Sequence, residues 1–240
     1  MSKIILESFF PEVANLYGDN GNMRYLKLCI PDAETVIDRL NEEPYFVKNT
    51  PSFIAMSPMS ERAQELVIAR LFPYRERIAE LIEIGCIFLM TGNAMEIFFD
   101  EIQNEDGTSI KGLGIFHYVA KRKMFDRYNR HCMGDFGDIR IVGYKNQFTH
   151  AYGDNSKEFF LSVTKGDGIN RESQLEGIKR NNFFGTYLLG PILIQNPKFT
   201  RYILSLLDRS DVSLPFEETI MAAYERRREE YEEMEFGLYS

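Results

Sequence analysis

The chain has 240 residues, 44% of them hydrophobic and 27% charged, which is typical of one large soluble domain or two small ones. Its net charge of −8 argues against non-specific nucleic-acid binding, and no apolar stretch approaches the roughly 20 residues that span a bilayer. The N-terminus lacks a signal peptide's apolar region, so we expect a cytoplasmic protein. Three scattered cysteines and three scattered histidines predict no disulfide framework, metal site or cofactor.

The N-terminal part of the chain predicts alternating strands and helices. In chain order these are a strand over 3–10, a helix to Cys29 capped by Asp19 or Asn20, a strand or helix over 35–40, a strand over 52–57, a helix capped by Ser60, a helical piece over 73–85, a strand over 86–90 and a helix over 92–101. This alternation favours a parallel sheet.

The rest of the chain is richer in predicted strands. They cover residues 110–121, 138–145, 158–164 and 183–189, and helices follow over 197–209 and 216–235. The last helix is dense in both charge signs, which indicates a solvated helix with i,i+4 pairs rather than a docking helix for a partner. No linker divides the chain, so we expect one domain over 1–214 with a charged C-terminal helix over 215–240.

These elements predict an α/β fold of three layers: a mostly parallel central sheet with added antiparallel strands, flanked by helices. The most informative segment lies at residues 87–95, where an apolar strand ends in Thr91-Gly92 and a helical pattern begins. Many α/β enzymes expose a nucleophile at such an elbow. Thr91 would take that position here, although a threonine hydroxyl is a weak nucleophile without a base.

Several segments together resemble the class I glutamine amidotransferase domains of the cobyric acid synthase-like group, and among them the glutaminase subunits of lipid II isoglutaminyl synthase. The similarity runs to about Asp208 and rests on residues 16–22, 60–64, 91–92, 106–115, 142–146 and 185–193, of which Gly-Thr-Tyr-Leu and Gly-Pro-Ile-Leu are the most specific pieces. The resemblance implies a flavodoxin-like fold, and a Mur ligase-like synthetase as partner.

The family's chemistry requires an elbow cysteine, a histidine base and an oxyanion loop. At the matching positions this chain has Thr91 for the cysteine and Leu189 for the histidine. Pro58 removes a backbone donor from the loop that holds Ser57. The substrate segment is replaced by residues 146–151, which include Asn146, Gln147 and His150. We therefore expect a degenerate pocket at Thr91, Gly92, Leu189, Ser57, Asn146, Gln147 and His150, without catalytic residues.

Other residues could restore activity only in unusual arrangements. A Thr91–His150 dyad is one of them, and a cysteine nucleophile is another, although Cys29 and Cys86 have the pattern of core residues. His131 and Cys132 are adjacent, so on a strand they point to opposite faces. The carboxylates Asp19, Glu61 and Glu96 are interpreted as helix caps or solvated helix positions.

Three functions remain open. The first is an inactive amidotransferase-like protein that binds a ligand or a partner, such as a Mur ligase-like synthetase or a second copy of the chain. The second is a hydrolase or amidotransferase of altered chemistry that uses Thr91 or a cysteine. The third is a structural module that uses its acidic surface and C-terminal helix. The joint loss of cysteine and histidine favours the first.

Overall fold

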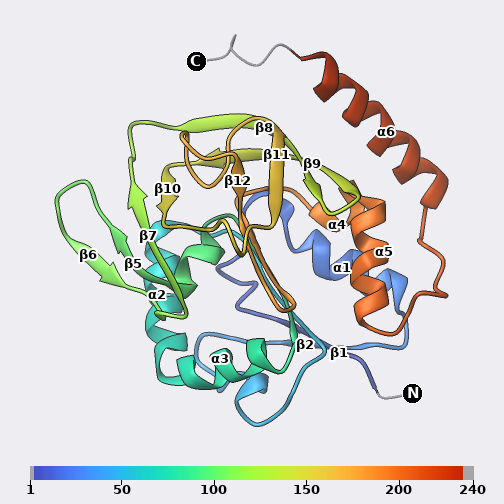
Figure 1. The fold of residues 1–240 in the computed structure, drawn as a ribbon. Helices are drawn as coiled ribbons and strands as arrows, with labels where there is room; N and C mark the ends of the chain where they lie inside the picture. The colour runs from blue at the N-terminus through green and yellow to red at the C-terminus, as the bar shows by residue number, and fades with distance from the viewer. Residues whose placement is uncertain (1–2, 235–240) are drawn as a thin grey trace.

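The computed structural model describes residues 3–234, and a six-stranded sheet forms its centre (Figure 1). Its strands, in spatial order, are β13 (Ile178–Arg180), β14 (Phe183–Thr186), β4 (Ile87–Thr91), β3 (Phe53–Met56), β1 (Ile5–Ser8) and β2 (Glu34–Ile37). All neighbours pair in parallel except β13 and β14. This is the strand order of flavodoxin-like sheets with one antiparallel edge strand, so the predicted fold class is confirmed.

Helices cover both faces of this sheet because side chains alternate along its buried strands. Ile54 and Met56 of β3 pack with α2 (Glu61–Leu71) and α3 (Arg75–Glu83) on one face. Phe53 and Ala55, from the same strand, pack with helices on the other face. Those helices are α1 (Gly21–Cys29), the one-turn α4 (Ile192–Gln195) and α5 (Pro197–Leu206). The three-layer arrangement thus follows from period-2 patterning in the strands.

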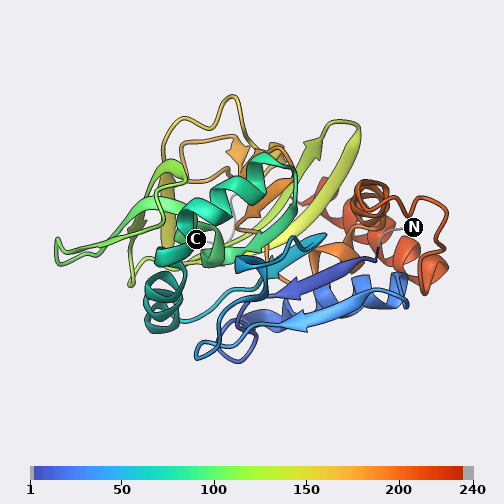
Figure 2. The same cartoon turned by 90° about the horizontal axis from the view of Figure 1, so that it is seen from below.

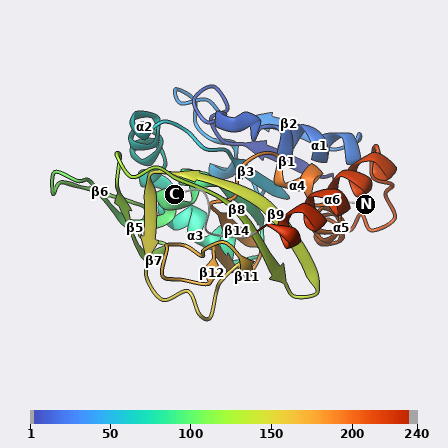
Figure 3. The ribbon, with the colours of Figure 1, turned by 90° about the horizontal axis from the view of Figure 1, so that it is seen from above.

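The additional strands form two further sheets of four strands each. One has the order β10 (Thr149–Tyr152), β7 (Phe116–Arg122), β5 (Phe99–Gln103) and β6 (Ser109–Lys111), and the other has β12 (Leu175–Glu176), β11 (Leu161–Lys165), β8 (Tyr128–Phe136) and β9 (Ile139–Gln147). β8 and β9 pair along nine residues as a long antiparallel hairpin. The hairpin of β5 and β6 lies at one end of the molecule and the C-terminal helix at the other (Figures 2 and 3).

Two element predictions are wrong. The expected helix over 92–101 is a 3₁₀ helix, η4 (Gly92–Phe98), followed directly by β5, because the aromatic end of the segment pairs with β7. The expected strand over 110–121 is broken into β6 and β7. A Cβ on Gly112 would lie 2.2 Å from the Phe99 carbonyl oxygen, and Gly114 takes φ +67°, so the chain turns between the two strands.

The remaining elements are short 3₁₀ helices and the C-terminal helix. The 3₁₀ helices are η1 (Leu16–Gly18), η2 (Tyr45–Val47) and η3 (Phe72–Tyr74). Helix α6 (Glu217–Glu233) packs Tyr224 and Tyr231 against β8 and β9, and the Tyr224 hydroxyl donates to the Arg140 carbonyl at 2.8 Å. The division of the chain at residue 214 stays a prediction. Within residues 3–234, no helix is long and apolar enough to cross a membrane.

Candidate functional site

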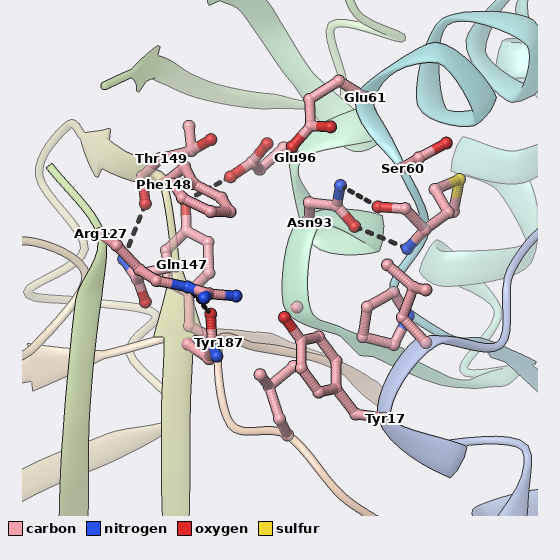
Figure 4. A pocket seen from close by; sticks show the side chains of 16 residues that line it. Tyr17, Ser60, Glu61, Asn93, Glu96, Arg127, Gln147, Phe148, Thr149 and Tyr187 are labelled. Atoms are coloured by element: carbon pink, nitrogen blue, oxygen red, sulfur yellow. Dashed lines mark hydrogen bonds between the residues drawn. The ribbon is translucent and has the colours of Figure 1, made fainter. Parts of the chain in front are cut away.

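A cavity of about 270 Å³ lies outside the carboxyl ends of the parallel strands (Figure 4), where open α/β sheets bind ligands. Its walls come from the turns after β1, β3, β4 and β14, together with the end of β9 and the segment before β8. The lining residues are Leu16, Tyr17, Pro58, Met59, Ser60, Glu61, Gly92, Asn93, Glu96, Arg127, Asn146, Gln147, Phe148, Thr149, Tyr187 and Leu189.

Thr91 ends β4 but does not line this cavity. Its backbone is extended (φ −106°, ψ 148°), and the left-handed residue of the turn is Gly92 at φ +56°. The Thr91 side chain is buried, and its Oγ1 donates to the Met56 carbonyl oxygen at 3.4 Å. The expectation that the elbow exposes Thr91 is therefore wrong, because Gly92 makes the turn and leaves the threonine inside the sheet edge.

The carboxyl of Asp19, from the turn before α1, lies close to the Thr91 hydroxyl. Asp19 is 1% exposed, and burial raises the pKa of its carboxyl to about 8. The Thr91 hydroxyl and the Gly190 N–H lie close to it but outside hydrogen-bonding geometry. Asp19 does not cap a helix as predicted, because the turn carries it into the protein. Asn20 occupies the N-cap position of α1, but its side chain instead accepts from Ser57.

The corner beside the elbow is filled by apolar side chains. A Cβ on Gly92 would lie 2.7 Å from Pro58 Cγ and 3.0 Å from Leu189 Cδ2, so these two side chains close on the turn. Leu189 is held there by its N–H, which donates to the Tyr144 carbonyl at 2.8 Å. The position expected for a base thus presents only hydrocarbon.

The loop after β3 offers few backbone donors to an anion. Pro58 has no N–H, and the Met59 N–H donates to Asn93 Oδ1 at 3.0 Å. Asn93 Nδ2 in turn donates to the Met59 carbonyl at 2.8 Å. The side-chain amide of Asn93 therefore occupies both the N–H and the carbonyl of Met59. Ser60 caps α2 as predicted, with Oγ accepting from the Ala63 N–H at 3.3 Å.

The wall of the cavity formed by η4 contains a buried acid. Glu96, on η4, accepts from the Tyr187 hydroxyl at 3.0 Å and from Gln64 Nε2 at 2.9 Å. Burial raises the pKa of the Glu96 carboxyl to about 7, opposed by these two hydrogen bonds and by the charge of Arg122. The interpretation of Glu96 as a solvated helix position is wrong, since no part of it reaches solvent.

Arg127 and Gln147 lie across the cavity from Asn93 and Ser60 (Figure 4), and Asn146 also lines it. Arg127 Nε donates to Asn146 Oδ1 at 3.0 Å, and its guanidinium lies 5.1 Å from the centre of the Phe148 ring. Gln147 Nε2 donates to the Thr149 carbonyl at 2.7 Å, whereas Gln147 Oε1 has no hydrogen-bond partner although the residue is only 8% exposed. Of the predicted pocket positions, the cavity therefore brings together Gly92, Leu189, Asn146 and Gln147.

Ser57 and His150 do not line the cavity. Ser57 Oγ donates to Asn20 Oδ1 at 2.9 Å. His150 is buried on β10, with Nδ1 3.4 Å from Gln147 Nε2 and its ring packed edge-on against Tyr128. Burial lowers the pKa of His150 to about 4, so the ring is neutral at physiological pH. The neighbours of Thr91 and of His150 are different residues, so the Thr91–His150 dyad does not form.

The three cysteines are equally remote from the cavity. Cys29 lies on α1, Cys86 precedes β4 and Cys132 lies on β8, and all three are buried. Burial raises the pKa of these thiols to about 11, 12 and 12, so they are protonated at neutral pH. Within residues 3–234, no group of three or more His, Cys, Asp or Glu side chains could hold a metal ion.

Sequence reasoning missed Asp19, Glu96, Arg127 and Tyr187. A signal existed for Glu96, because it is the single charged residue in the run Ala94–Phe99 and its neighbours Met95 and Ile97 are strongly apolar. Arg127 carries no such signal, because strand β8, which follows it, was not predicted.

The chain is similar to two curated relatives over most of its length. One is subunit GatD of the glutamine-hydrolysing lipid II isoglutaminyl synthase of Staphylococcus aureus (strain N315). The two chains are 30% identical over 213 residues, and the matched region covers 85% of this chain and 84% of the relative. This chain is 24% identical over 228 residues to the GatD subunit of Streptococcus pneumoniae (strain ATCC BAA-255 / R6), across 89% and 85%.

Among solved structures, a glutamine amidotransferase from Thermotoga maritima superposes with a TM-score of 0.53 over 97% of this chain and 93% of that one. At 8% identity, this likeness concerns the fold alone. No family model matches the chain.

Proposed function

The chain belongs to the family of GatD-type glutaminase subunits of lipid II isoglutaminyl synthase, and from this premise we propose that it is a subunit that no longer hydrolyses glutamine. The observation that carries the proposal is the apolar corner at the elbow. Glutaminase chemistry needs a thiolate, a base and oxyanion donors. This corner instead contains the buried Thr91, the hydrocarbon of Leu189 and the imino acid Pro58.

The proposal keeps a binding role for the cavity. A pocket that had lost all function would be free to fill with apolar side chains, as its elbow corner has. The rest of the cavity instead keeps the exposed Arg127 and the buried polar groups of Glu96 and Gln147, which cost free energy to hold in a protein interior. These groups support ligand binding without turnover.

The chain would also act as a subunit. Both curated relatives are named as subunits of a synthase, and the family resemblance implies a Mur ligase-like synthetase as the second component. We therefore propose that this chain binds such a synthetase in the cytoplasm, with self-association as the competing arrangement. In this complex, the synthetase would respond to whether the cavity of this chain holds a ligand.

Altered chemistry at Thr91 or a cysteine has less support. Thr91 is 1% exposed and donates its hydroxyl hydrogen to a backbone carbonyl, and no lining residue of the cavity is a cysteine or histidine. The carboxyl of Asp19 lies close to the Thr91 hydroxyl, but burial raises its pKa to about 8, so it is mostly protonated at neutral pH and is a poor base there.

A glutaminase assay tests the proposal. The purified full chain is incubated with glutamine, and ammonia and glutamate are measured against buffer and against the Thr91→Ala and Leu189→Ala variants. All three proteins should match the buffer, while a known glutaminase added to the same mixture should turn over. Turnover by the unmodified chain that disappears in Thr91→Ala would overturn the proposal.

The partner role is tested separately by size-exclusion chromatography with light scattering. The chain is mixed with the Mur ligase-like synthetase of the same organism, and a hetero-complex is expected. A mixture that elutes as two separate species, with or without glutamine, contradicts the proposed assembly.

A further inference from the structure

The turn between β7 and β8, over residues 123–126, exposes two consecutive large apolar residues. Met124 is 39% exposed and Phe125 is 98% exposed. Tight turns usually contain glycine, proline, asparagine, aspartate or serine, and a phenyl ring in water lacks the free energy that its burial would give. The turn lies at an outer corner of the molecule (Figure 1), so a flat surface can reach it.

Hydrogen bonds fix the conformation of this turn. The Asp126 N–H donates to the Lys123 carbonyl at 3.0 Å, which makes the two apolar residues the central pair of a β-turn. The Lys123 N–H donates to the Phe148 carbonyl, and Arg171 Nη2 donates to Asp126 Oδ1 at 2.6 Å. These bonds hold the turn in the conformation that exposes its two central side chains.

Basic residues surround the apolar pair. Residues 121–130 contain five basic residues and one acidic residue, a net charge of +4, although the chain as a whole has a net charge of −8. Four of the five basic residues reach solvent at least in part: Lys121, Lys123, Arg127 and Arg130. The acidic residue, Asp126, is paired with Arg171. The turn is therefore the centre of a basic region on an acidic protein.

A lipid surface with anionic headgroups complements this arrangement. Apolar side chains enter the boundary between headgroups and acyl chains, while the long basic side chains beside them stay level with the phosphates. A fluid surface needs no shaped socket, whereas a stable protein interface buries about 800 Å² per partner, which two adjacent side chains do not supply. The remaining chain has a net charge of −12 and is repelled by such a surface, so this turn approaches it first.

We propose that the turn between β7 and β8 is a peripheral membrane anchor, in which the apolar pair inserts into an anionic bilayer surface and its basic neighbours bind the phosphates. The contact is with one leaflet, since within residues 3–234 no helix is long and apolar enough to cross a membrane. The anchor goes beyond the proposed function and does not depend on it. Because Arg127 also lines the cavity, the bound state places the cavity next to the bilayer.

Cosedimentation with vesicles tests the proposal on the unmodified chain. One set of vesicles is phosphatidylcholine alone, and the other contains phosphatidylglycerol and phosphatidylcholine in equal parts. Each basic residue near an anionic surface strengthens binding about fivefold, so the partition coefficient should be at least about tenfold higher for the second set at low salt. It should fall as salt is added. Equal partition into both sets, or no sedimentation with either, would overturn the proposal.

A tryptophan probe tests which residue inserts. The chain contains no tryptophan, so Phe125→Trp reports on the turn alone. Its emission should shift to shorter wavelength when anionic vesicles are added. The matched control is Phe216→Trp, at a phenylalanine that is 69% exposed just before α6, and its emission should not change. If the Phe125→Trp protein sediments with vesicles but its emission stays constant, the turn is not the anchor.

Charge reversal tests the basic neighbours. Lys123→Glu changes the local charge by two and should weaken binding to anionic vesicles about 25-fold. The control is Lys157→Glu, at an exposed residue beyond the end of β10 that is farther from the turn, and it should bind as the unmodified chain does. Equal losses in the two variants would show a response to net charge and contradict a local anchor.

Discussion

The elbow corner, formed by Pro58, Gly92 and Leu189, and the acidic wall around Glu96 line the same cavity, but their side chains differ in polarity. At the corner, Pro58 and Leu189 press hydrocarbon against the turn at Gly92. At the wall, Glu96 is surrounded by donors whose own orientations are fixed by further hydrogen bonds. The corner formed by Pro58, Gly92 and Leu189 has no ionisable side chain, whereas the wall holds a buried carboxyl in a network of hydrogen bonds.

Under the proposed function, chemistry and binding have separated within one pocket. A nucleophile and its base act only as a pair, so the loss of one removes selection on the other. A buried, hydrogen-bonded carboxylate is different, because removing any partner leaves a charge unsatisfied. The wall is therefore expected to be sensitive to single substitutions, whereas the corner should be sensitive mainly to changes in volume.

The largest expected effect is at the buried ion pair of Glu176 and Lys145, whose charged atoms lie 3.6 Å apart. Glu176 also accepts from the N–H of Tyr187 at 2.8 Å, and the Tyr187 hydroxyl donates to Glu96, so this pair supports the acidic wall. Glu176→Gln leaves the Lys145 ammonium buried without its counter-charge, and we expect a loss of about 3–5 kcal/mol in the free energy of unfolding. Urea denaturation followed by circular dichroism measures this loss.

The control for this prediction is an exposed ion pair of α6. Glu230→Gln removes the partner of Arg226 at the surface and should leave the unfolding curve unchanged within error. A Lys145→Met/Glu176→Gln double variant should recover part of the loss. If Glu176→Gln is as harmless as Glu230→Gln, the pair does not support the wall.

An intermediate effect is expected at the corner. Gly92→Ala adds a Cβ within 2.7 Å of Pro58 at a residue with φ +56°, so it should cost about 3 kcal/mol from steric overlap and backbone strain together. The matched control is Gly107→Ala, where φ is +85° and no atom lies within 4 Å of the added Cβ. Its cost should be only about 1 kcal/mol. Equal losses in thermal unfolding would show that the corner is not closely packed.

The smallest expected effect is the pH dependence of stability that the buried carboxyl of Asp19 causes. Its folded pKa of about 8 lies above the ordinary value, so the folded state keeps a proton that the unfolded chain releases. This contribution is present at low pH and is lost as the pH rises toward 8. Asp19→Asn should therefore gain about 2 kcal/mol relative to the unmodified chain between pH 6.5 and pH 8.5.

The free energy of unfolding of both proteins, measured by urea denaturation across this pH range, tests whether the difference rises with pH. The pKa values of Glu7 and Glu96 are also raised, but these residues are common to both proteins and cancel in the difference. A difference that stays constant with pH, or that falls, contradicts a protonated Asp19.

The sequence by itself determined the parallel core of the fold. Strands β1, β3 and β4, and helices α2, α3 and α5, follow from apolar periodicity and local caps, which are properties of neighbouring residues. The sequence also showed that Thr91 and Leu189 stand where the family has its cysteine and histidine, because each replacement concerns one residue at one position of a motif. These features needed no knowledge of distant contacts.

Tertiary structure alone decided where the polar side chains lie. Strand β8 contains Asn129, Arg130 and His131, and it forms because β9 pairs with it along its length. Asp19 and Glu96 have the local pattern of a cap and a helix surface, yet chain turns and the packing of η4 bury them. The burial of Glu96 depends on hydrogen-bond partners that are distant in sequence, Gln64 and Tyr187. A local sequence pattern contains no information about contacts of this kind.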